Sequence, residues 1–521
     1  MKNYLEARKY YEQALKFDPE NITYMLRLAH IKIQTSSSPK EYLGAEFYLL
    51  KAFKKEPRNP EVLMAYGDYY YALNQWQEAL NFYEKARRSQ ENFMAYLRMA
   101  KIYLKWGQNE KARDFLLKAE NLNSMNYQVT FELGKFYLIQ KDFEMAQKYL
   151  ELTLKFYPEF KEGLLKIIHF YILQKDYSAA ITKTNELLKL DPENPLLYYY
   201  MGVCFDNLGQ VEEALRFLKN GRKYDFSNEP LRIKAEEIAV KNLPLGHTIR
   251  KELAEFYLLQ AREYYIKKQN PQAILYYKRG LRINPLSVEI RKELAQIYRE
   301  KGWIDLYLRT IAAGIFTNPN NQELKDIQEL NQRFLWETLS YKEKQDQYQT
   351  PAFFPILYLG NTIHDPENLH PHFFSELKEL VMEGLVNTHS LNVKELEDKD
   401  LHKIKKNNSL FLRLRYYEDD RKIELEGEIV SLATGNIFKK YLVRRYGNLR
   451  VTEAILELSK QIAADIIPFG RIIKISDDKA LINIGSLQNV KVKDKFAIMK
   501  SQEVIDDYFS NSLFRSHFVI G

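Results

Sequence analysis

Polar and apolar residues follow one another along most of the chain at the three- and four-residue spacing of amphipathic helices. A longer period is superimposed on that spacing. Alanines recur at intervals of 34, 33, 34, 34 and 34 residues: Ala45, Ala79, Ala112, Ala146, Ala180 and Ala214. A second series has a small residue or its substitute followed three residues later by an aromatic: Gly67 and Tyr70, Ala100 and Tyr103, Gly134 and Tyr137, Ile168 and Tyr171, Gly202 and Phe205. A period of this length predicts stacked helix–turn–helix units.

The small residues have a direct packing role in such units. Helices approach closely only where no large side chain separates them, so we expect the small residue of the first helix to face the alanine of the second. The aromatic is expected to fill the gap between neighbouring helix pairs. Prolines such as Pro19, Pro158 and Pro192 follow the second helices, where they prevent further helical turns.

This pattern resembles the tetratricopeptide repeat over about residues 1–320. The closest match is the run Tyr66-Gly67-Asp68-Tyr69-Tyr70, followed by Ala79, Tyr83 and Ala86 at the expected spacing. The regular repeats extend over residues 1–226. One or two helices out of phase are predicted at 227–253, around 230–240 and 249–254, and further repeats at 254–320. A capping helix is predicted at 321–349, because the last repeat of a solenoid otherwise exposes its apolar face.

The first repeat is predicted to lack its first helix. Tyr4 to Pro19 matches a second helix, with Ala7, Tyr11 and Ala14 in the expected places. An isolated second helix would expose an apolar face, so we expect the chain to begin inside a longer protein. A signal peptide or membrane anchor would then lie upstream, and we expect a periplasmic or cell-envelope location in that case and a cytoplasmic one otherwise.

The resemblance implies a concave groove lined by the first helix of each repeat. Its candidate partner-binding residues are Met64, Tyr71, Leu97, Lys101, Leu104, Phe131, Lys135, Leu138, Leu165, His169, Tyr199, Leu258, Arg262 and Tyr265. An apolar floor with occasional charges suits an amphipathic helix or an extended peptide of another protein. The alternative is that tight packing, or the chain itself, fills the lining. The Lys/Asn clamp of chaperone-binding relatives is absent from these positions.

From about residue 350 the pattern changes to the two-residue alternation of strands. Strands are predicted at 354–359, 391–393, 409–417, 423–432 and 437–443, with helices at 372–386 and 451–466. Gly427 lies inside a strand pattern and predicts a bulge. The order strand–helix–strand–strand–strand–helix over 350–467 resembles the α/β domain shared by CsgG, the N-terminal domain of TolB and the middle domain of FlgT. The residues that carry this resemblance are the strand before Gly360, the turn at Thr434-Gly435 and the closing helix.

The last segment, 468–521, predicts a small barrel. Its runs Phe469 to Ile475, Ala480 to Gly485 and Val490 to Ile498 are short strands separated by Gly and Asp turns. They resemble the C-terminal domain of FlgT, although Lys493 replaces a glycine of that family. The predicted fold class is therefore mainly α: a tetratricopeptide-repeat superhelical solenoid followed by a small α/β domain and a short SH3-like β-barrel.

Composition excludes several functions. The net charge of +8 is spread over the solenoid without a dense basic cluster, which argues against nucleic-acid binding. One cysteine, Cys204, excludes an internal disulfide, and no run approaches the ~18 apolar residues of a membrane span. His370-Pro371-His372 lacks the further ligands of a metal site. With no phosphate loop or nucleophile motif either, we expect no cofactor, no metal and no catalysis.

The sequence thus predicts a non-enzymatic scaffold for protein–protein interaction. The FlgT-like tail implies a periplasmic or cell-envelope assembly, or a flagellar-motor accessory protein, of a bacterium. Two alternatives remain open at this point. One is a cytoplasmic peptide-binding adaptor, and the other is an envelope-export or peptidoglycan-associated protein.

Overall fold

The computed structural model describes residues 2–35, 39–225, 227–339, 356–360, 363–364, 368–370, 373–388, 391–396, 409–419, 422–431, 435–466, 472–476 and 479–482. The chain divides into two compact units, Met1–Leu190 and Asp191–Gly521, which we call unit 1 and unit 2. This division lies ahead of residue 226, where the regular repeats were predicted to end.

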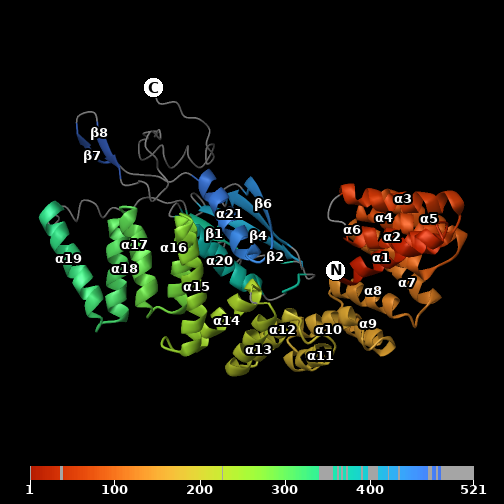
Figure 1. The fold of residues 1–521 in the computed structure, drawn as a ribbon, viewed down its shortest axis with the longest axis horizontal. Helices are drawn as coiled ribbons and strands as arrows, with labels where there is room; N and C mark the ends of the chain where they lie inside the picture. Colours follow the sequence, from red (N-terminus) through yellow and green to blue (C-terminus); the bar gives the residue numbers. More distant parts are fainter. Residues whose placement is uncertain are drawn as a thin grey trace. The chain divides into compact units, whose positions relative to one another are not determined.

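Unit 1 consists of helices connected by short turns (Figure 1). Its helices are α1 (Lys2–Phe17), α2 (Ile22–Thr35), α3 (Pro39–Lys55), α4 (Pro60–Ala72), α5 (Trp76–Ser89), α6 (Phe93–Lys105), α7 (Asn109–Leu122), α8 (Tyr127–Ile139), α9 (Phe143–Phe156), α10 (Lys161–Leu173) and α11 (Tyr177–Leu190). Helix α1 is the predicted second helix at the start of the chain, and α2 to α11 form five helix pairs.

Unit 2 begins with further helices and ends with a sheet. The helices are α12 (Pro195–Asn207), α13 (Val211–Tyr224), α14 (Glu229–Asn242), α15 (Thr248–Ile266), α16 (Asn270–Ile283), α17 (Val288–Glu300), α18 (Ile304–Thr317), α19 (Gln322–Leu339), α20 (Phe374–Val386) and α21 (Arg450–Asp465). The strands are β1 (Ile356–Leu359), β2 (Ile363–His364), β3 (Asn392–Glu395), β4 (Ser409–Glu418), β5 (Lys422–Ser431), β6 (Ile437–Tyr446), β7 (Ile472–Ser476) and β8 (Lys479–Ile482). Among the described residues, no helix is long and apolar enough to cross a membrane.

The small residues allow the two helices of each pair to approach closely, as predicted. All six periodic alanines have no exposed surface. A Cβ atom added to Gly67 would lie 2.2 Å from the Tyr83 ring, and one added to Gly202 would lie 2.5 Å from Leu218. These are clashes between the first and second helix of one pair. The long period of the sequence is therefore the period of these close crossings.

Four of the five periodic aromatics stack on a ring twelve residues later, in the second helix of their own pair. The fifth differs, because the Tyr171 hydroxyl donates a hydrogen bond to Glu151 of α9, in the preceding pair. The ring centroids of Tyr103 and Phe115 are 5.2 Å apart at 8°, and those of Tyr137 and Tyr149 are 5.5 Å apart at 4°. The same stacking joins Tyr70 to Phe82 and Phe205 to Phe217. The sequence did not predict this stacking within a pair, because the second aromatic was not recognised as part of the pattern. Tyr70 and Tyr103 also pack against core residues of neighbouring pairs, in line with the predicted role between pairs.

Helix boundaries in the repeats follow from caps and turns. The side chains of Asn59, Asn92 and Asn126 accept hydrogen bonds from backbone N–H groups at the starts of α4, α6 and α8. The turn inside a pair requires one residue with positive φ, which is Gly107 between α6 and α7. Lys141 takes the same conformation between α8 and α9, at some cost for a residue with a Cβ atom.

The two out-of-phase helices were predicted only in part. Helix α14 corresponds to the first of them. The second does not exist as a separate helix, because α15 runs without a break from Thr248 to Ile266 and includes the first helix of the next repeat. Tyr307, at a position that is alanine in other repeats, is buried and receives a hydrogen bond from Asn331 of α19, 2.8 Å from its hydroxyl oxygen. Helix α19 matches the predicted cap over its described part.

The α/β domain contains the five predicted strands and two predicted helices in the predicted succession, together with a short strand, β2, that was not predicted. Its sheet has the strand order β3-β1-β4-β5-β6, with β2 also paired to β4; β1 is parallel to β3 and β4, whereas β4, β5 and β6 are antiparallel. Helices α20 and α21 cover one face, where Leu380, Leu412 and Ile455 share one core. We refer to residues 356–466 as the α/β domain.

Two predictions for this region have different outcomes. Gly427 is not a bulge: it pairs regularly with Leu414 and Tyr441, and the register shift lies between Ile429 and Val430. A Cβ atom at Gly427 would lie 3.3 Å from Leu458, so this glycine lets α21 approach the sheet. Of the predicted barrel, β7 and β8 form an antiparallel pair. Its third strand, at 490–498, lies outside the described residues.

Candidate protein-binding groove

The candidate groove positions of unit 1 lie on the first helices α4, α6, α8 and α10. Their side chains fall into two groups. Half-buried ones keep part of their surface accessible: Met64, Tyr71, Lys101, Leu104, Phe131, Lys135 and Leu165. Leu97, Leu138 and His169 are buried. The first group provides an apolar surface with two ammonium groups, which is the composition expected of a surface that binds a segment of another protein.

Charged residues cross unit 1 from helix to helix along these positions. Arg98 Nε lies 2.8 Å from Asp68 Oδ1, which also accepts a hydrogen bond from the Tyr83 hydroxyl at 2.8 Å. Farther along, Lys101 Nζ and Lys135 Nζ both lie 2.9 Å from Glu132, one at each carboxylate oxygen. Two ammonium groups therefore share one carboxylate, and the cluster as a whole carries a positive charge.

Burial and the neighbouring charges shift the pKa values of this cluster in opposite directions. Burial tends to raise the pKa of Glu132, but the neighbouring Lys135 and Lys101 keep that pKa below its ordinary value. Burial lowers the pKa of Lys101, and Glu132 only partly offsets this. A second carboxylate at this position, supplied by a bound protein, would stabilise the two ammonium groups further.

The candidate position on α12, in unit 2, is in a different environment. Tyr199 is fully buried, and its ring centroid lies 4.7 Å from that of His370 in the α/β domain. The hydroxyl of the next residue, Tyr200, donates a hydrogen bond to the backbone oxygen of Leu369 at 3.1 Å. Burial raises the pKa of Tyr199 well above its ordinary value. Here the chain itself covers the lining, which is the self-packing alternative, so Tyr199 is a core residue of unit 2.

The last three candidate positions, on α15, contact the next repeat. Leu258 is buried. Arg262 binds Glu293 and Glu289 of α17 at 2.5 Å, and Tyr265 donates a hydrogen bond to Glu300 at 2.8 Å. These polar pairs connect consecutive first helices. The structure therefore brings the candidate positions together as one kind of surface only within α4 to α10.

Helix α14 carries charges that the sequence did not identify as functional. It packs against α12, α13, α15, α16 and α20. Nearly all of its side chains from Glu229 to Ala239 are buried, including Arg232 and Lys234. Ile233 belongs to the core of the α/β domain. The charges on this helix are therefore paired inside the protein, since an unpaired buried charge is very costly.

Lys234 is the centre of one such group. Its Nζ lies 3.2 Å from Asp206 of α12, 2.7 Å from Glu237 and 3.0 Å from Glu376 of α20. Burial tends to lower the pKa of Lys234, but Glu376, Glu237 and Asp206 raise it above its ordinary value. Burial and the neighbouring Glu376 raise the pKa of Glu237 to about 7. This group connects two repeat helices to the first turn of α20.

Glu229 supplies the cap that α21 lacks. The residue before α21, Leu449, makes no capping side-chain hydrogen bond. Instead the Glu229 carboxylate accepts hydrogen bonds from the backbone N–H of Val451 at 2.7 Å and of Thr452 at 3.2 Å. A carboxylate at this place also interacts favourably with the positive end of the helix dipole. A repeat residue therefore completes a helix more than 200 positions later in the chain.

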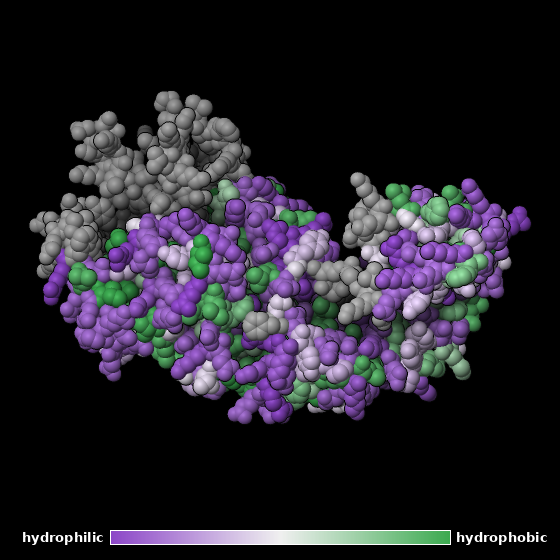
Figure 2. Space-filling view, in the orientation of Figure 1, coloured by the Kyte–Doolittle hydropathy of each residue, from purple (hydrophilic) through white to green (hydrophobic). Residues whose placement is uncertain are grey.

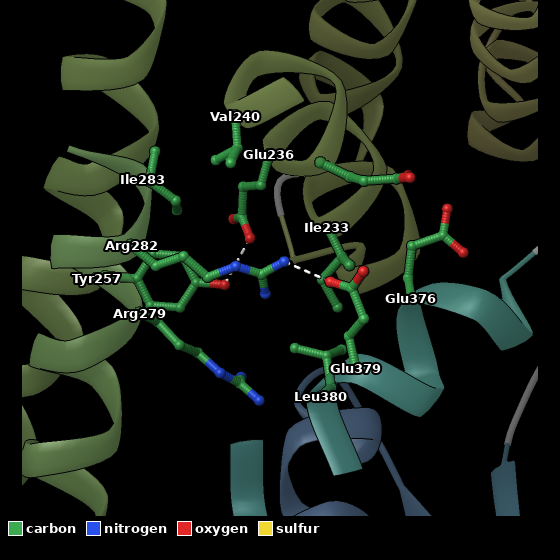
Figure 3. Close-up of a pocket in the computed structure, with 11 residues that line it drawn as sticks. Ile233, Glu236, Val240, Tyr257, Arg279, Arg282, Ile283, Glu376, Glu379 and Leu380 are labelled. Carbon is green, nitrogen blue, oxygen red and sulfur yellow. Dashed lines mark hydrogen bonds and ion pairs between the residues drawn. The ribbon is translucent and has the colours of Figure 1, made fainter. Parts of the chain in front are cut away.

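Helix α16 makes a second row of contacts with the domain. Arg279 binds Glu383 at 3.3 Å and Thr452 Oγ1 at 3.1 Å, and Arg282 binds Glu379 at 2.5 Å. A narrow cavity lies next to this row, between α14, α15, α16 and α20 (Figure 3). It encloses about 410 Å³, part of which is open solvent. Its acidic and basic walls already bind each other, so it is part of the domain contact.

A second part of the contact between the α/β domain and the repeats contains the buried carboxylate of Glu418. Glu418 Oε2 lies 2.8 Å from His370 Nδ1 and accepts a hydrogen bond from the Tyr416 hydroxyl, while Oε1 lies 3.0 Å from Arg450 Nη2. Burial tends to raise the pKa of Glu418, but His370 and Arg450 keep it below its ordinary value. This group positions His370 against Tyr199, a role that the sequence did not indicate, because His370 was considered there only as a candidate metal ligand.

Comparison with known proteins identifies the repeats. Family profiles match in three places: "Tetratricopeptide repeat" at residues 1–21 and 171–235, and "Anaphase-promoting complex, cyclosome, subunit 3" at residues 40–119. The helical region consists of tetratricopeptide repeats. Because these profiles cover separate short stretches, they say nothing of the α/β domain.

Similar curated proteins match this chain at low identity. A TPR repeat-containing protein of Methanocaldococcus jannaschii is 26% identical over 387 residues, which are 60% of this chain and 66% of that protein. The BBSome complex member BBS4 of Bos taurus is 26% identical over 40% of this chain and 43% of that protein. The chain thus spans less than two thirds of the length of these relatives.

Solved structures match with low scores. One is the chain reported as "Crystal structure of APC/C hetero-tetramer Cut9-Hcn1", which has a TM-score of 0.37 and 16% identity, over 56% of this chain and 52% of that chain. Another, "Crystal structure of YrrB: a TPR protein with an unusual peptide-binding site", has a TM-score of 0.30 and 18% identity, over 35% of this chain and 95% of that chain.

The face of the present chain that Figure 2 shows is mainly hydrophilic, with small scattered hydrophobic groups.

Proposed function

We propose that this protein is a non-enzymatic scaffold in which unit 1 binds a segment of another protein and unit 2 presents the α/β domain. The observation that supports this most is the difference between equivalent positions. Phe131 in unit 1 is half-buried, whereas Tyr199 in unit 2 is fully buried by the chain's own α/β domain. Relatives named as members of multi-protein complexes are consistent with such a role.

A displayed library of random short peptides tests the role of unit 1. We expect peptides selected on the intact protein to carry apolar side chains and a carboxylate, and to lose binding to the variants Phe131→Glu and Lys135→Glu. The matched control is Leu122→Glu, because Leu122 is 44% exposed on the second helix α7. Selected peptides that bind all three variants equally would contradict a groove on the first helices.

We propose further that the scaffold belongs to a bacterial cell-envelope assembly, such as one associated with the flagellar motor. The support is the order β1, α20, β3, β4, β5, β6, α21, which shares with the CsgG, TolB and FlgT resemblance an opening strand and helix, a run of strands and a closing helix, with one strand more in the run. Fractionation of cells that express the full-length gene product tests this. Recovery in the periplasmic or membrane fraction is expected, and recovery with cytosolic markers alone would favour the cytoplasmic adaptor.

A further inference from the structure

The sheet of the α/β domain ends at β6, a ten-residue strand. Among the described residues, β6 pairs with β5 on one side and with no strand on the other. At about 3.3 Å per residue, this side offers roughly 33 Å of backbone edge. Ile437, Leu442 and Tyr446 along the strand are 46%, 54% and 64% exposed. Figure 1 shows β6 at the margin of the sheet.

We propose that the outer edge of β6, over Lys440 to Tyr446, binds an acidic, extended segment of a partner protein, which adds to the sheet as a further strand. This surface is separate from the groove of unit 1 and does not depend on it. Edge backbone groups provide hydrogen bonds to such a segment, and the side chains of the edge strand select its sequence.

The charge of β6 indicates the chemistry of the segment. The strand reads IFKKYLVRRY, with four basic residues and no acidic one. Lys440 and Arg444 lie on the face of the sheet away from α20 and α21, and their side chains are 58% and 54% exposed. Neighbouring strands with like charges repel each other, so two copies of β6 are poorly suited to pair. An acidic strand avoids this repulsion.

The protein already contains an example of this pairing. Strand β5, KIELEGEIVS, is acidic at every second residue, and in the register of the pair Glu428 lies opposite Lys440 and Glu424 opposite Arg444. Lys440 Nζ lies 2.5 Å from the Glu428 carboxylate, and Arg444 Nε lies 3.2 Å from the Glu424 carboxylate. The glutamates of these pairs lie partly or fully buried, but the long side chains of Lys440 and Arg444 remain more than half exposed and can also reach a strand on the other side of β6.

Leu442 is the residue best suited to a test. It lies opposite Glu426 on the outer face, between Lys440 and Arg444. Because it is exposed, its replacement leaves the core unchanged. Leu442→Glu adds a negative charge where an acidic segment would bind, and Leu442→Lys adds a positive one at the same place.

The probe is a fluorescent peptide with the sequence of residues 422–431, added to the intact chain. Its control is the same peptide with lysine in place of the three glutamates. We expect the acidic peptide to bind and to slow hydrogen exchange of β6 amides, with Leu442→Glu and the lysine peptide each weakening binding at least about tenfold. Leu442→Lys should bind as tightly as the original chain or more tightly.

Four results would overturn the proposal. They are no binding of the acidic peptide at millimolar concentration, equal binding of both peptides, equal binding to both Leu442 variants, and slowed exchange outside β6. Far-UV circular dichroism and the unfolding midpoint of each variant establish that it is folded before binding is measured. Because the unit 1 groove is unchanged in both variants, failure here leaves the function proposed for unit 1 untouched.

Discussion

Phe131 on α8 and Tyr199 on α12 occupy the same position of two repeats, but they differ in what covers them. Phe131 keeps part of its surface, and Lys135 Nζ lies 4.9 Å from its ring centroid. Tyr199 has no exposed surface and contacts His370. Both sites hold an aromatic side chain, but at Tyr199 a residue 171 positions later in the chain covers the site.

Charges show the same difference between the two units. In unit 1, Lys101 and Lys135 share Glu132 and remain 30% and 25% exposed. In unit 2, Lys234 is 8% exposed and surrounded by three carboxylates. A charge at a binding surface must stay accessible to a partner, whereas one at a permanent contact must be satisfied within the chain. The predictions below test this distinction.

The largest difference is expected from removing one lysine in each unit. Lys234→Met leaves three carboxylates together without their cation, so we expect it to lower the free energy of unfolding of unit 2 by about 3–5 kcal/mol. Lys101→Met leaves Lys135 beside Glu132 and should cost unit 1 less than about 1 kcal/mol. Urea unfolding followed by circular dichroism measures both. Similar losses in the free energy of unfolding would show that Lys234 and Lys101 stabilise their units to the same extent.

Replacing Tyr199 should mainly lower stability, whereas replacing Phe131 should mainly weaken peptide binding. Tyr199→Ala leaves a cavity between α12 and the α/β domain, and we expect a loss of about 3 kcal/mol. Phe131→Ala should cost about 1 kcal/mol or less, because its ring is only half-buried, and should weaken peptide binding instead. Thermal unfolding and the peptide assay measure the two effects. Loss of stability in Phe131→Ala as large as in Tyr199→Ala would mean that unit 1 has no open groove.

The cap that Glu229 provides should have a smaller effect. Glu229→Gln keeps the size of the side chain but removes its charge from the start of α21, so we expect a loss of about 1–2 kcal/mol. The control is Glu110→Gln at the start of α7, an exposed residue that should change stability by less than about 0.5 kcal/mol. Equal effects in a denaturant titration would argue against a specific cap.

The smallest effect on the stability of unit 2 is expected from a change of pH. The pKa of Glu237 is raised from 4.5 to about 7, so its contribution is complete below pH 4.5 and is lost as pH rises through 7. The pKa of Glu418 is lowered, so its contribution is complete above 4.5 and is lost as pH falls. On these two groups, unit 2 should be most stable at about pH 4.5 to 5 and should lose stability between about pH 5 and 7. Glu237→Gln should remove the loss on the alkaline side, and an unchanged pH profile would contradict this assignment.

Much of the solenoid could be predicted because each close helix crossing needs a small residue, and the period of Gly67, Ala79 and their equivalents is visible in the sequence. The order of strands and helices in the α/β domain was predictable for a similar reason. Strands with one buried face alternate every second residue, as β4 and β5 do. In both regions, the packing that fixes the local structure also fixes the spacing of residues seen in the sequence.

The contact between the repeats and the α/β domain could not be predicted in this way. Glu229 caps a helix 222 residues later, and no periodicity relates Lys234 to Glu376. One signal was present, since α14 carries charges on all sides and has no single polar face, which is unusual for a helix of a soluble repeat array. Charges around a whole helix indicate that each must find a partner, but not where that partner lies.

The central claim is that α14 and the α/β domain form one cooperative structure, whereas the first helices of unit 1 are open to a partner. Hydrogen exchange followed by mass spectrometry on the intact chain tests it most directly. We expect Glu229→Gln to accelerate exchange in α14, α20 and the first turn of α21 together, and to leave α6 and α8 unchanged. Faster exchange in α21 alone, with α14 still fully protected, would contradict it.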